Sequence, residues 1–157
     1  MRKRVLFVVD ASFLGWAMFE QDPARQEEVD SLQQTLSAGA GMHAPRLIVY
    51  ELGNMLRKIL HSVSFDKRAS AHQALLNDVT LWDGSEEQVG TIHQLAEHYN
   101  LTFYDASYLE LAGRDDASVL ITQDNRLVNA AKRALGKNRA FMGAEAFSRF
   151  ANTEGTA

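Results

Sequence analysis

The chain has no cysteine among its 157 residues, and long apolar runs are also missing. Without cysteine, neither a disulfide framework nor a zinc site with cysteine ligands is possible. Only about six apolar residues follow the basic residues 2–4, which is fewer than a secretory signal or a membrane span needs. We therefore expect a protein of the cytoplasm that does not contact a membrane.

Positive charge is scarce as well. The 16 lysines and arginines are outnumbered by 20 acidic residues, which gives a net charge of −4. Proteins that bind nucleic acid through its phosphates alone are usually basic, so a general electrostatic binder of nucleic acid is disfavoured. The exception is a protein whose acidic residues hold divalent cations, because the cations invert the local charge.

The length and the ordinary hydrophobic content of 46% predict one globular domain. Strands are predicted over 4–9, 79–82, 119–122 and 139–142. Helices are predicted over 12–20, 23–38, 45–62, 65–77, 85–99, 104–113 and 125–135. This alternation favours an α/β layered domain with a mainly parallel sheet over residues 1–150, followed by a frayed tail over 151–157.

Local signals support several of these boundaries. Asp22 followed by Pro23 is typical of a helix start, and Ser85 with Gln88 forms a capping box. Pro45 is likewise expected to open a helix. That helix is apolar on nearly every side, so we expect it to be buried on most of them.

Two predicted strands end at an aspartate. Asp10 follows "VLFVV" and Asp124 follows "VLITQ", with the hydroxyl residues Ser12 and Thr122 close by. Ligand sites of open α/β sheets form beyond the carboxyl ends of the strands, so the two aspartates are expected at one sheet edge. Taken alone, either aspartate is better explained as a turn residue or a helix N-cap.

Two further acids lie on predicted helices. Glu51 is flanked by apolar residues, and no basic residue lies one turn away to neutralise it; buried glutamates are rare unless they are paired or bind a metal. Asn54 lies on the same helix face. Asp105 falls at the entry of the helix over 104–113, where it is explained equally well as an N-cap.

Together the four carboxylates of Asp10, Glu51, Asp105 and Asp124 form a set of hard oxygen ligands. Mg²⁺ and Mn²⁺ prefer such ligands, and a metal-bound water is acidic enough to attack phosphorus. Without cations, four clustered negative charges repel one another and any phosphate. One or two ions at this site explain how an acidic protein acts on RNA.

The chain resembles the PIN domains, in particular the VapC-like toxin ribonucleases of type II toxin–antitoxin pairs. The resemblance is carried by "DAS" (10–12), "APRLIVYELGNML" (44–56), "YDASYLELA" (104–112) and "LITQDNRLVNAA" (120–131), in the family's order. It implies a three-layer α/β/α sandwich and a Mg²⁺- or Mn²⁺-dependent endoribonuclease. Asp10, Glu51, Asp105 and Asp124 match the family's acidic quartet, and Ser12, Asn54 and Thr122 its supporting positions. One departure is Gln123, where a small residue is usual.

The resemblance also implies partners, namely a second copy of the chain and a small antitoxin protein. Arg126, two residues past Asp124, is our choice for a contact to an RNA phosphate. The competing hypothesis is a PIN-like module that binds RNA or protein and no longer cleaves. Serine hydrolase chemistry is unsupported because the chain has no Gly-x-Ser-x-Gly motif.

Overall fold

A five-stranded sheet lies at the centre of the computed structural model, which describes residues 5–39 and 41–151. The strands are β1 (Phe7–Val9), β2 (Met42–Pro45), β3 (Val79–Trp82), β4 (Val119–Ile121) and β5 (Ala140–Phe141). They are all parallel and stand in the order β3-β2-β1-β4-β5. The central strands β1 and β4 are buried along their whole length, as continuous apolar runs predict.

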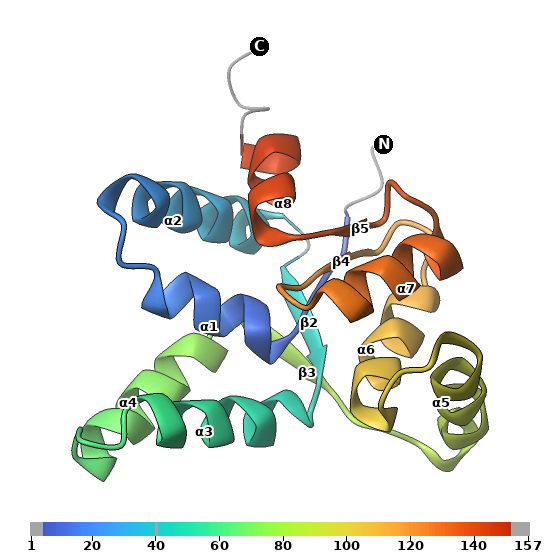
Figure 1. The fold of residues 1–157 in the computed structure, drawn as a ribbon, viewed down its shortest axis with the longest axis horizontal. Coiled ribbons are helices and arrows are strands. Elements are labelled where there is room, and N and C mark those ends of the chain that lie inside the picture. Colours follow the sequence, from blue (N-terminus) through green and yellow to red (C-terminus); the bar gives the residue numbers. More distant parts are fainter. Residues whose placement is uncertain (1–4, 40, 152–157) are drawn as a thin grey trace.

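Helices cover both faces of the sheet (Figure 1). They are α1 (Ala11–Phe19), α2 (Pro23–Ala38), α3 (Ile48–Ile59), α4 (Phe65–Leu76), α5 (Glu86–Tyr99), α6 (Phe103–Gly113), α7 (Asn125–Leu135) and α8 (Gly143–Phe150). The group α5, α6 and α7 lies on one side, and α1 to α4 with α8 lie on the other. The predicted three-layer α/β/α sandwich is therefore confirmed. No helix within the described ranges is long and apolar enough to cross a membrane.

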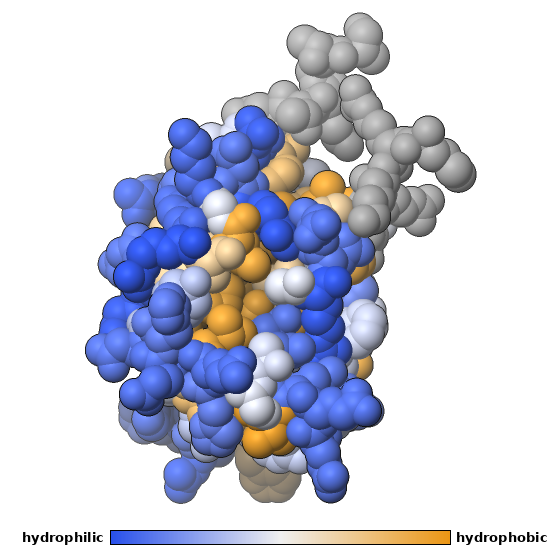
Figure 2. Space-filling model, turned by 90° about the vertical axis from the view of Figure 1, so that its right-hand side faces the viewer, coloured by the Kyte–Doolittle hydropathy of each residue, from blue (hydrophilic) through white to orange (hydrophobic). Residues whose placement is uncertain are grey.

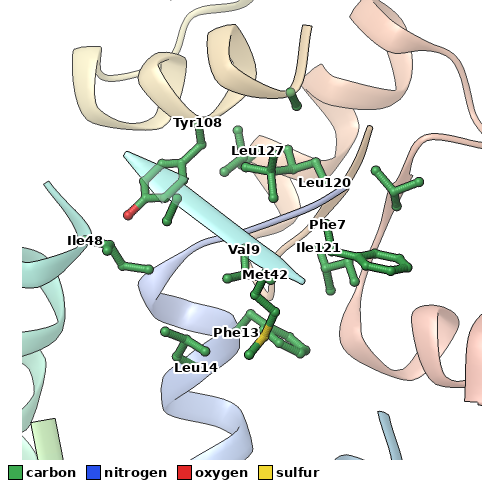
Figure 3. Close-up of a cluster of buried hydrophobic side chains, with 14 of the residues drawn as sticks. Phe7, Val9, Phe13, Leu14, Met42, Ile48, Tyr108, Leu120, Ile121 and Leu127 are labelled. Carbon is green, nitrogen blue, oxygen red and sulfur yellow. The ribbon is translucent and has the colours of Figure 1, made fainter. Parts of the chain in front are cut away.

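The buried core joins the sheet to helices on both sides (Figure 3). Phe13 and Leu14 of α1 pack on one side of the strands, and Leu127 and Tyr108 on the other, each no more than 1% exposed. In Figure 3 the Tyr108 ring extends from α6 toward Ile48 of α3, with its hydroxyl at the far end. A polar atom thus reaches α3 through the core.

The outer helices are amphipathic. On the side of the molecule that carries α5 and α7, a strip of hydrophobic residues is flanked by hydrophilic ones (Figure 2). Leu95 and Tyr99 of α5 and Leu135 of α7 are partly buried against the core. The polar sides of these helices face the solvent, as their periodicity predicts.

Several predicted boundaries agree with the structure. Strand β3 has the predicted bounds, and Asp22 caps α2 by accepting a hydrogen bond from the Ala24 N–H. The capping box of Ser85 and Gln88 is present at the start of α5. Gly136, with a φ of 105°, follows α7 in a conformation that glycine adopts readily. Residue 4 of the first predicted strand and residues 152–157 of the predicted tail lie outside the described residues.

The prediction that Pro45 opens a helix is wrong. Pro45 is the last residue of β2, opposite Trp82 of β3, and α3 begins only at Ile48. Pairing of β2 with β1 ends at His43, so the N–H that proline lacks is not needed in that ladder. The apolar run before Pro45 contains a histidine and is too short to indicate a strand.

The expectation that α3 is buried on most sides is also wrong. Ile48, Leu52 and Leu56 form one buried face, whereas Tyr50 is 75% exposed and Ile59 is 49% exposed. The helix lies at the side of the molecule, next to α1 and α4, so only one face meets the core. Exposed apolar residues of α3 therefore remain available to a ligand or a partner.

Helix α8 was not predicted from the sequence. It is short, and it packs next to α2 (Figure 1). Phe150 at its end meets Phe7 edge to face, with ring centroids 5.1 Å apart, and Phe141 at 5.6 Å. A contact with β1, which is distant in sequence, and one with the neighbouring β5 thus hold this helix in place.

Candidate active site

The candidate site lies at the carboxyl ends of β1 and β4, where the strand order reverses. The register pairs Val9 with Ile121, so the next residues, Asp10 and Thr122, leave the sheet side by side. Between β1 and β4 the chain switches from building the sheet in one direction to building it in the other. This switch point is the usual place for a ligand in an open α/β sheet.

The Asp10 carboxylate is held by three hydrogen bonds. Its Oδ1 accepts from the Ser12 hydroxyl at 2.7 Å and from the Phe13 N–H at 3.0 Å, and its Oδ2 accepts from the Thr122 hydroxyl at 2.6 Å. Asp10 therefore acts as the N-cap of α1, but it also receives two side-chain donors. Ser12 and Thr122 both orient this one carboxylate.

Burial dominates the electrostatics of Asp10, whose residue is only 6% exposed. It raises the pKa of the carboxyl from 3.8 to about 6, against the hydrogen bonds from Thr122, Ser12 and Phe13, which lower it. The negative charge of Asp105 adds to the rise. Asp10 thus carries its charge at neutral pH at a cost to the folded state.

Asp124 is the N-cap of α7. Its Oδ1 accepts from the Arg126 N–H at 2.8 Å and from the Leu127 N–H at 3.3 Å. Its own N–H donates to the Thr122 hydroxyl oxygen at 3.0 Å, which links it to Asp10. The capping interpretation is thus correct for both aspartates, and it does not separate them from the site.

Glu51 has a partner that was not foreseen. Its Oε1 accepts a hydrogen bond of 2.8 Å from the Tyr108 hydroxyl, so the fully buried tyrosine of α6 reaches the first turn of α3. Burial raises the pKa of Glu51, the Tyr108 hydrogen bond lowers it, and the charges of Asp10 and Asp105 raise it further. The sequence held a signal for Tyr108, because residues three apart share a helix face and Asp105 precedes it by three.

Asp105 lies in the first turn of α6, but it is not the N-cap. Thr102 holds that position and accepts the Asp105 N–H at 3.1 Å, which leaves the Asp105 carboxylate free of the capping role. Burial and the charge of Asp124 raise the pKa of Asp105, whereas the Thr102 hydroxyl and the charge of Arg126 lower it. The capping alternative for Asp105 is therefore wrong.

The four acids influence one another across the sheet edge. Asp10 and Asp105 raise the pKa of Glu51, Asp105 raises that of Asp10, and Asp124 raises that of Asp105. These carboxylates belong to residues that follow β1, lie on α3 and α6, and precede α7, and each interacts electrostatically with at least one other. Their role as ligands of a cation stays a prediction.

The donor chemistry of this space suits a hard divalent cation, but the carboxylates do not form a closed cage. Within the described ranges, no three histidine, aspartate or glutamate side chains are grouped to hold a metal ion. Mg²⁺ commonly takes only one or two carboxylates and keeps several waters. The residues present fit such a partly hydrated ion.

The remaining predicted residues lie at the edges of the site. Asn54 is exposed, and together with Glu51 it lines a pocket against α6 rather than contacting the Asp10 network. Arg126 is exposed, and its Nη2 donates to the Asn100 carbonyl at 3.3 Å. Gln123, the departure noted in the sequence, donates its N–H to Ser12 Oγ and accepts the Gly143 N–H on its side chain.

Comparisons with known proteins concern the family and the fold. The family model of the PIN domain matches residues 7–133. Among solved structures, PAE2754 from Pyrobaculum aerophilum has a TM-score of 0.67 at 23% identity, covering 92% of this chain and 94% of the other. A search of curated proteins found no match.

Two further structures of similar fold come from toxin–antitoxin systems. VapBC2 from Rickettsia felis, bound to a DNA fragment from its promoter, has a TM-score of 0.58 at 10% identity, covering 87% of this chain and 98% of the other. Mycobacterium tuberculosis VapC20, a toxin that cleaves the Sarcin-Ricin loop, has a TM-score of 0.59 at 15% identity, covering 79% and 94%. At these identities the likeness concerns the fold.

Proposed function

Because the chain belongs to the PIN domain family, we propose that it is a Mg²⁺- or Mn²⁺-dependent endoribonuclease and the toxin of a toxin–antitoxin pair. The observation that carries the proposal is the link between Asp10 and Asp124 through Thr122 at the switch point of the sheet, together with the electrostatic coupling of Glu51 and Asp105 to these acids. VapC20, of similar fold, is a toxin that cleaves the Sarcin-Ricin loop, and the similar VapBC2 was solved bound to a DNA fragment from its promoter.

In this proposal Asp10 and Asp124 are the direct ligands of the cation, and Glu51 and Asp105 complete the site directly or through water. A bound Mg²⁺ or Mn²⁺ supplies an acidic water and neutralises the charge of the phosphodiester. Ser12 and Thr122 fix the Asp10 carboxylate, and Tyr108 fixes that of Glu51. Preorganised ligands of this kind lower the cost of assembling the site.

The phosphodiester of RNA would lie over the sheet edge, where Arg126 supplies positive charge. Its charge already lowers the pKa of Asp105, and its Nη2 donates to the Asn100 carbonyl. In-line attack on phosphorus needs both positioning and charge neutralisation, which the acids with their cation and Arg126 provide together. We further propose that the protein forms a homodimer and is inhibited by a small antitoxin.

The test is cleavage of single-stranded RNA by the wild type and by Asp10→Asn, with Mn²⁺ and with excess EDTA. The proposal predicts cleavage only by the wild type with Mn²⁺, while circular dichroism shows both proteins folded. Full cleavage in EDTA would contradict it. Uptake of Mn²⁺ in isothermal titration without cleavage of any RNA would favour the non-catalytic binding module instead.

A further inference from the structure

A pocket adjoins Glu51 and contains none of the residues of the Asp10 network. It lies between α3 and the first turn of α6, and its volume is about 470 Å³, within the range of small-molecule sites. Its walls are Glu51, Asn54, Met55, Lys58, Ile59 and Tyr104. The pocket therefore shares a wall with the candidate active site and extends it along α3.

The walls offer an aromatic ring and an aliphatic side chain to the solvent. Tyr104 is 62% exposed and Ile59 is 49% exposed, whereas Tyr108 of the same α6 is fully buried. Tyr104 makes no ring contact with the described residues, so the faces of its ring are available. The pocket thus presents one aromatic ring and one aliphatic side chain that a ligand can contact.

Lys58 adds positive charge to the same pocket. It makes no ion pair with a carboxylate of the part of the chain that the structure describes, and it is exposed. Lys58 follows Glu51 by seven residues, so both lie on one face of α3, about 10 Å apart along the helix axis. A phosphate at Lys58 is therefore a different one from the phosphate at the four acids.

We propose that this pocket binds one unpaired nucleotide of an RNA substrate, next to the bond that is cleaved. The base stacks on Tyr104, and its phosphate contacts Lys58. An aromatic platform beside a cation is the common way to bind single-stranded nucleic acid, and a base must be out of its helix to expose its face. The inference rests on the proposed function, and it specifies the substrate as single-stranded at this position.

The test measures RNA binding separately from cleavage. The probe is a single-stranded 12-nucleotide RNA with 2-aminopurine at one position, because stacking on an aromatic ring quenches this base. All variants are made in an Asp10→Asn background, in which the RNA stays uncleaved and one negative charge of the site is removed, and fluorescence anisotropy gives the dissociation constant. The same sequence as a duplex is measured in parallel.

Tyr104→Ala is expected to weaken binding about tenfold or more and to remove the quenching. Tyr104→Phe keeps the ring and should bind within about twofold of the parent. Lys58→Gln should make the dependence of affinity on salt shallower by about the contribution of one phosphate. Tyr50→Ala is the matched control: Tyr50 is 75% exposed and next to Glu51, but it does not line the pocket, so affinity should not change.

Equal affinity of Tyr104→Ala and the parent would overturn the proposal, as would equal binding of the duplex or no binding of RNA at all. Cleavage by the protein with Asp10 intact distinguishes this failure from failure of the nuclease. If RNA is cleaved equally well with and without the Tyr104 ring, the nucleotide pocket is rejected and the nuclease proposal stands. If RNA binding depends on Tyr104 but no RNA is cleaved, the nuclease proposal is rejected and the nucleotide pocket stands.

Discussion

Asp10 is a residue on which two opposing effects act. Its position directly after a buried strand removes water from the carboxylate, while Ser12, Thr122 and the Phe13 N–H replace part of the lost hydration. Burial is the larger effect, since the net result is a raised pKa of about 6. The Asp10 carboxylate is thus held rigidly, but its burial lowers the stability of the folded state at neutral pH.

Replacing Asp10 should make this loss of folding stability measurable. Because the pKa of Asp10 is raised in the folded state, its protonated form favours folding. This stabilisation is fully present below pH 3.8 and is lost as the pH rises through about 6. The loss amounts to about 3 kcal/mol at about 1.4 kcal/mol per pKa unit. In EDTA, the free energy of unfolding of Asp10→Asn relative to the wild type should therefore increase from pH 4 to pH 7.

Urea unfolding at several pH values measures this difference. The asparagine amide makes different hydrogen bonds, which changes the free energy of unfolding by the same amount at every pH. The change of the difference with pH is therefore the decisive quantity. A difference that stays flat between pH 4 and pH 7 would show that Asp10 is not strained by its burial.

Tyr108 and Glu51 provide a second prediction at the residue scale. Tyr108→Phe removes only the hydroxyl that donates to Glu51, and hydrogen bonds to charged groups contribute about 1.5–3 kcal/mol. Losing this donor also raises the pKa of Glu51 further, so the destabilisation should be greater at pH 8 than at pH 5. Urea unfolding at these two pH values gives the comparison.

Tyr99→Phe is the matched control for this change. Tyr99 is half-buried, and Arg133 lies over its ring, 5.4 Å from the centroid, a contact that phenylalanine keeps. It should be nearly neutral at both pH values. If the two variants behave alike, the hydroxyl of Tyr108 does not support Glu51.

At the scale of elements, Gln123 connects the candidate site to α8. Its N–H donates to Ser12 Oγ, and its side-chain oxygen accepts the Gly143 N–H at 2.7 Å. The side chain therefore satisfies one of the N–H groups left free at the start of a helix. The residue that departs from the family pattern has a defined role at the start of α8.

Gln123→Ala should lower the free energy of unfolding by about 1 kcal/mol, as loss of a helix cap usually does. Gln123→Glu keeps the acceptor oxygen and should retain most of the stability. The bond between the Gln123 N–H and Ser12 is a backbone contact that neither change removes, so RNA cleavage should persist in both. Thermal unfolding and a cleavage assay check the pair, and cleavage lost in Gln123→Ala alone would assign α8 a part in the site.

The elements also show how far sequence reasoning reaches. Strands β1 and β4 and the aspartates that follow them, Asp10 and Asp124, were predictable because an apolar run followed closely by aspartate is a local signal. Strand β2 and helix α8 were not predictable, because β2 is specified by pairing with Phe7 and Val79 and α8 by the rings of Phe7 and Phe141. The hydrogen bond of the Tyr108 hydroxyl could not be predicted, because the apolar periodicity of α6 marks Tyr108 simply as a core residue.

At the scale of the whole molecule, acidic residues outnumber basic ones and the net charge is −4. Among the acids, the charges of Asp10, Asp105 and Asp124 raise the pKa values of neighbouring carboxyls in the proposed site. A cation that binds there relieves repulsion present only in the folded state. Folding and metal binding are therefore expected to be linked.

Mn²⁺ should accordingly raise the melting temperature. At a concentration of 100 times its dissociation constant, a ligand of the folded state adds about 2.7 kcal/mol of stability. For a chain of this size that corresponds to a shift of about 5–10 °C. Protons compete for Asp10 below pH 6, so the shift should shrink from pH 7 to pH 5. Differential scanning calorimetry with and without Mn²⁺ measures this shift.

Two variants are the controls for this prediction. Asp10→Asn should show little shift at either pH, and Asp66→Asn, a change of an exposed acid on α4, should behave like the wild type. A shift of the same size at both pH values, or one that persists in Asp10→Asn, would mean that the cation binds elsewhere.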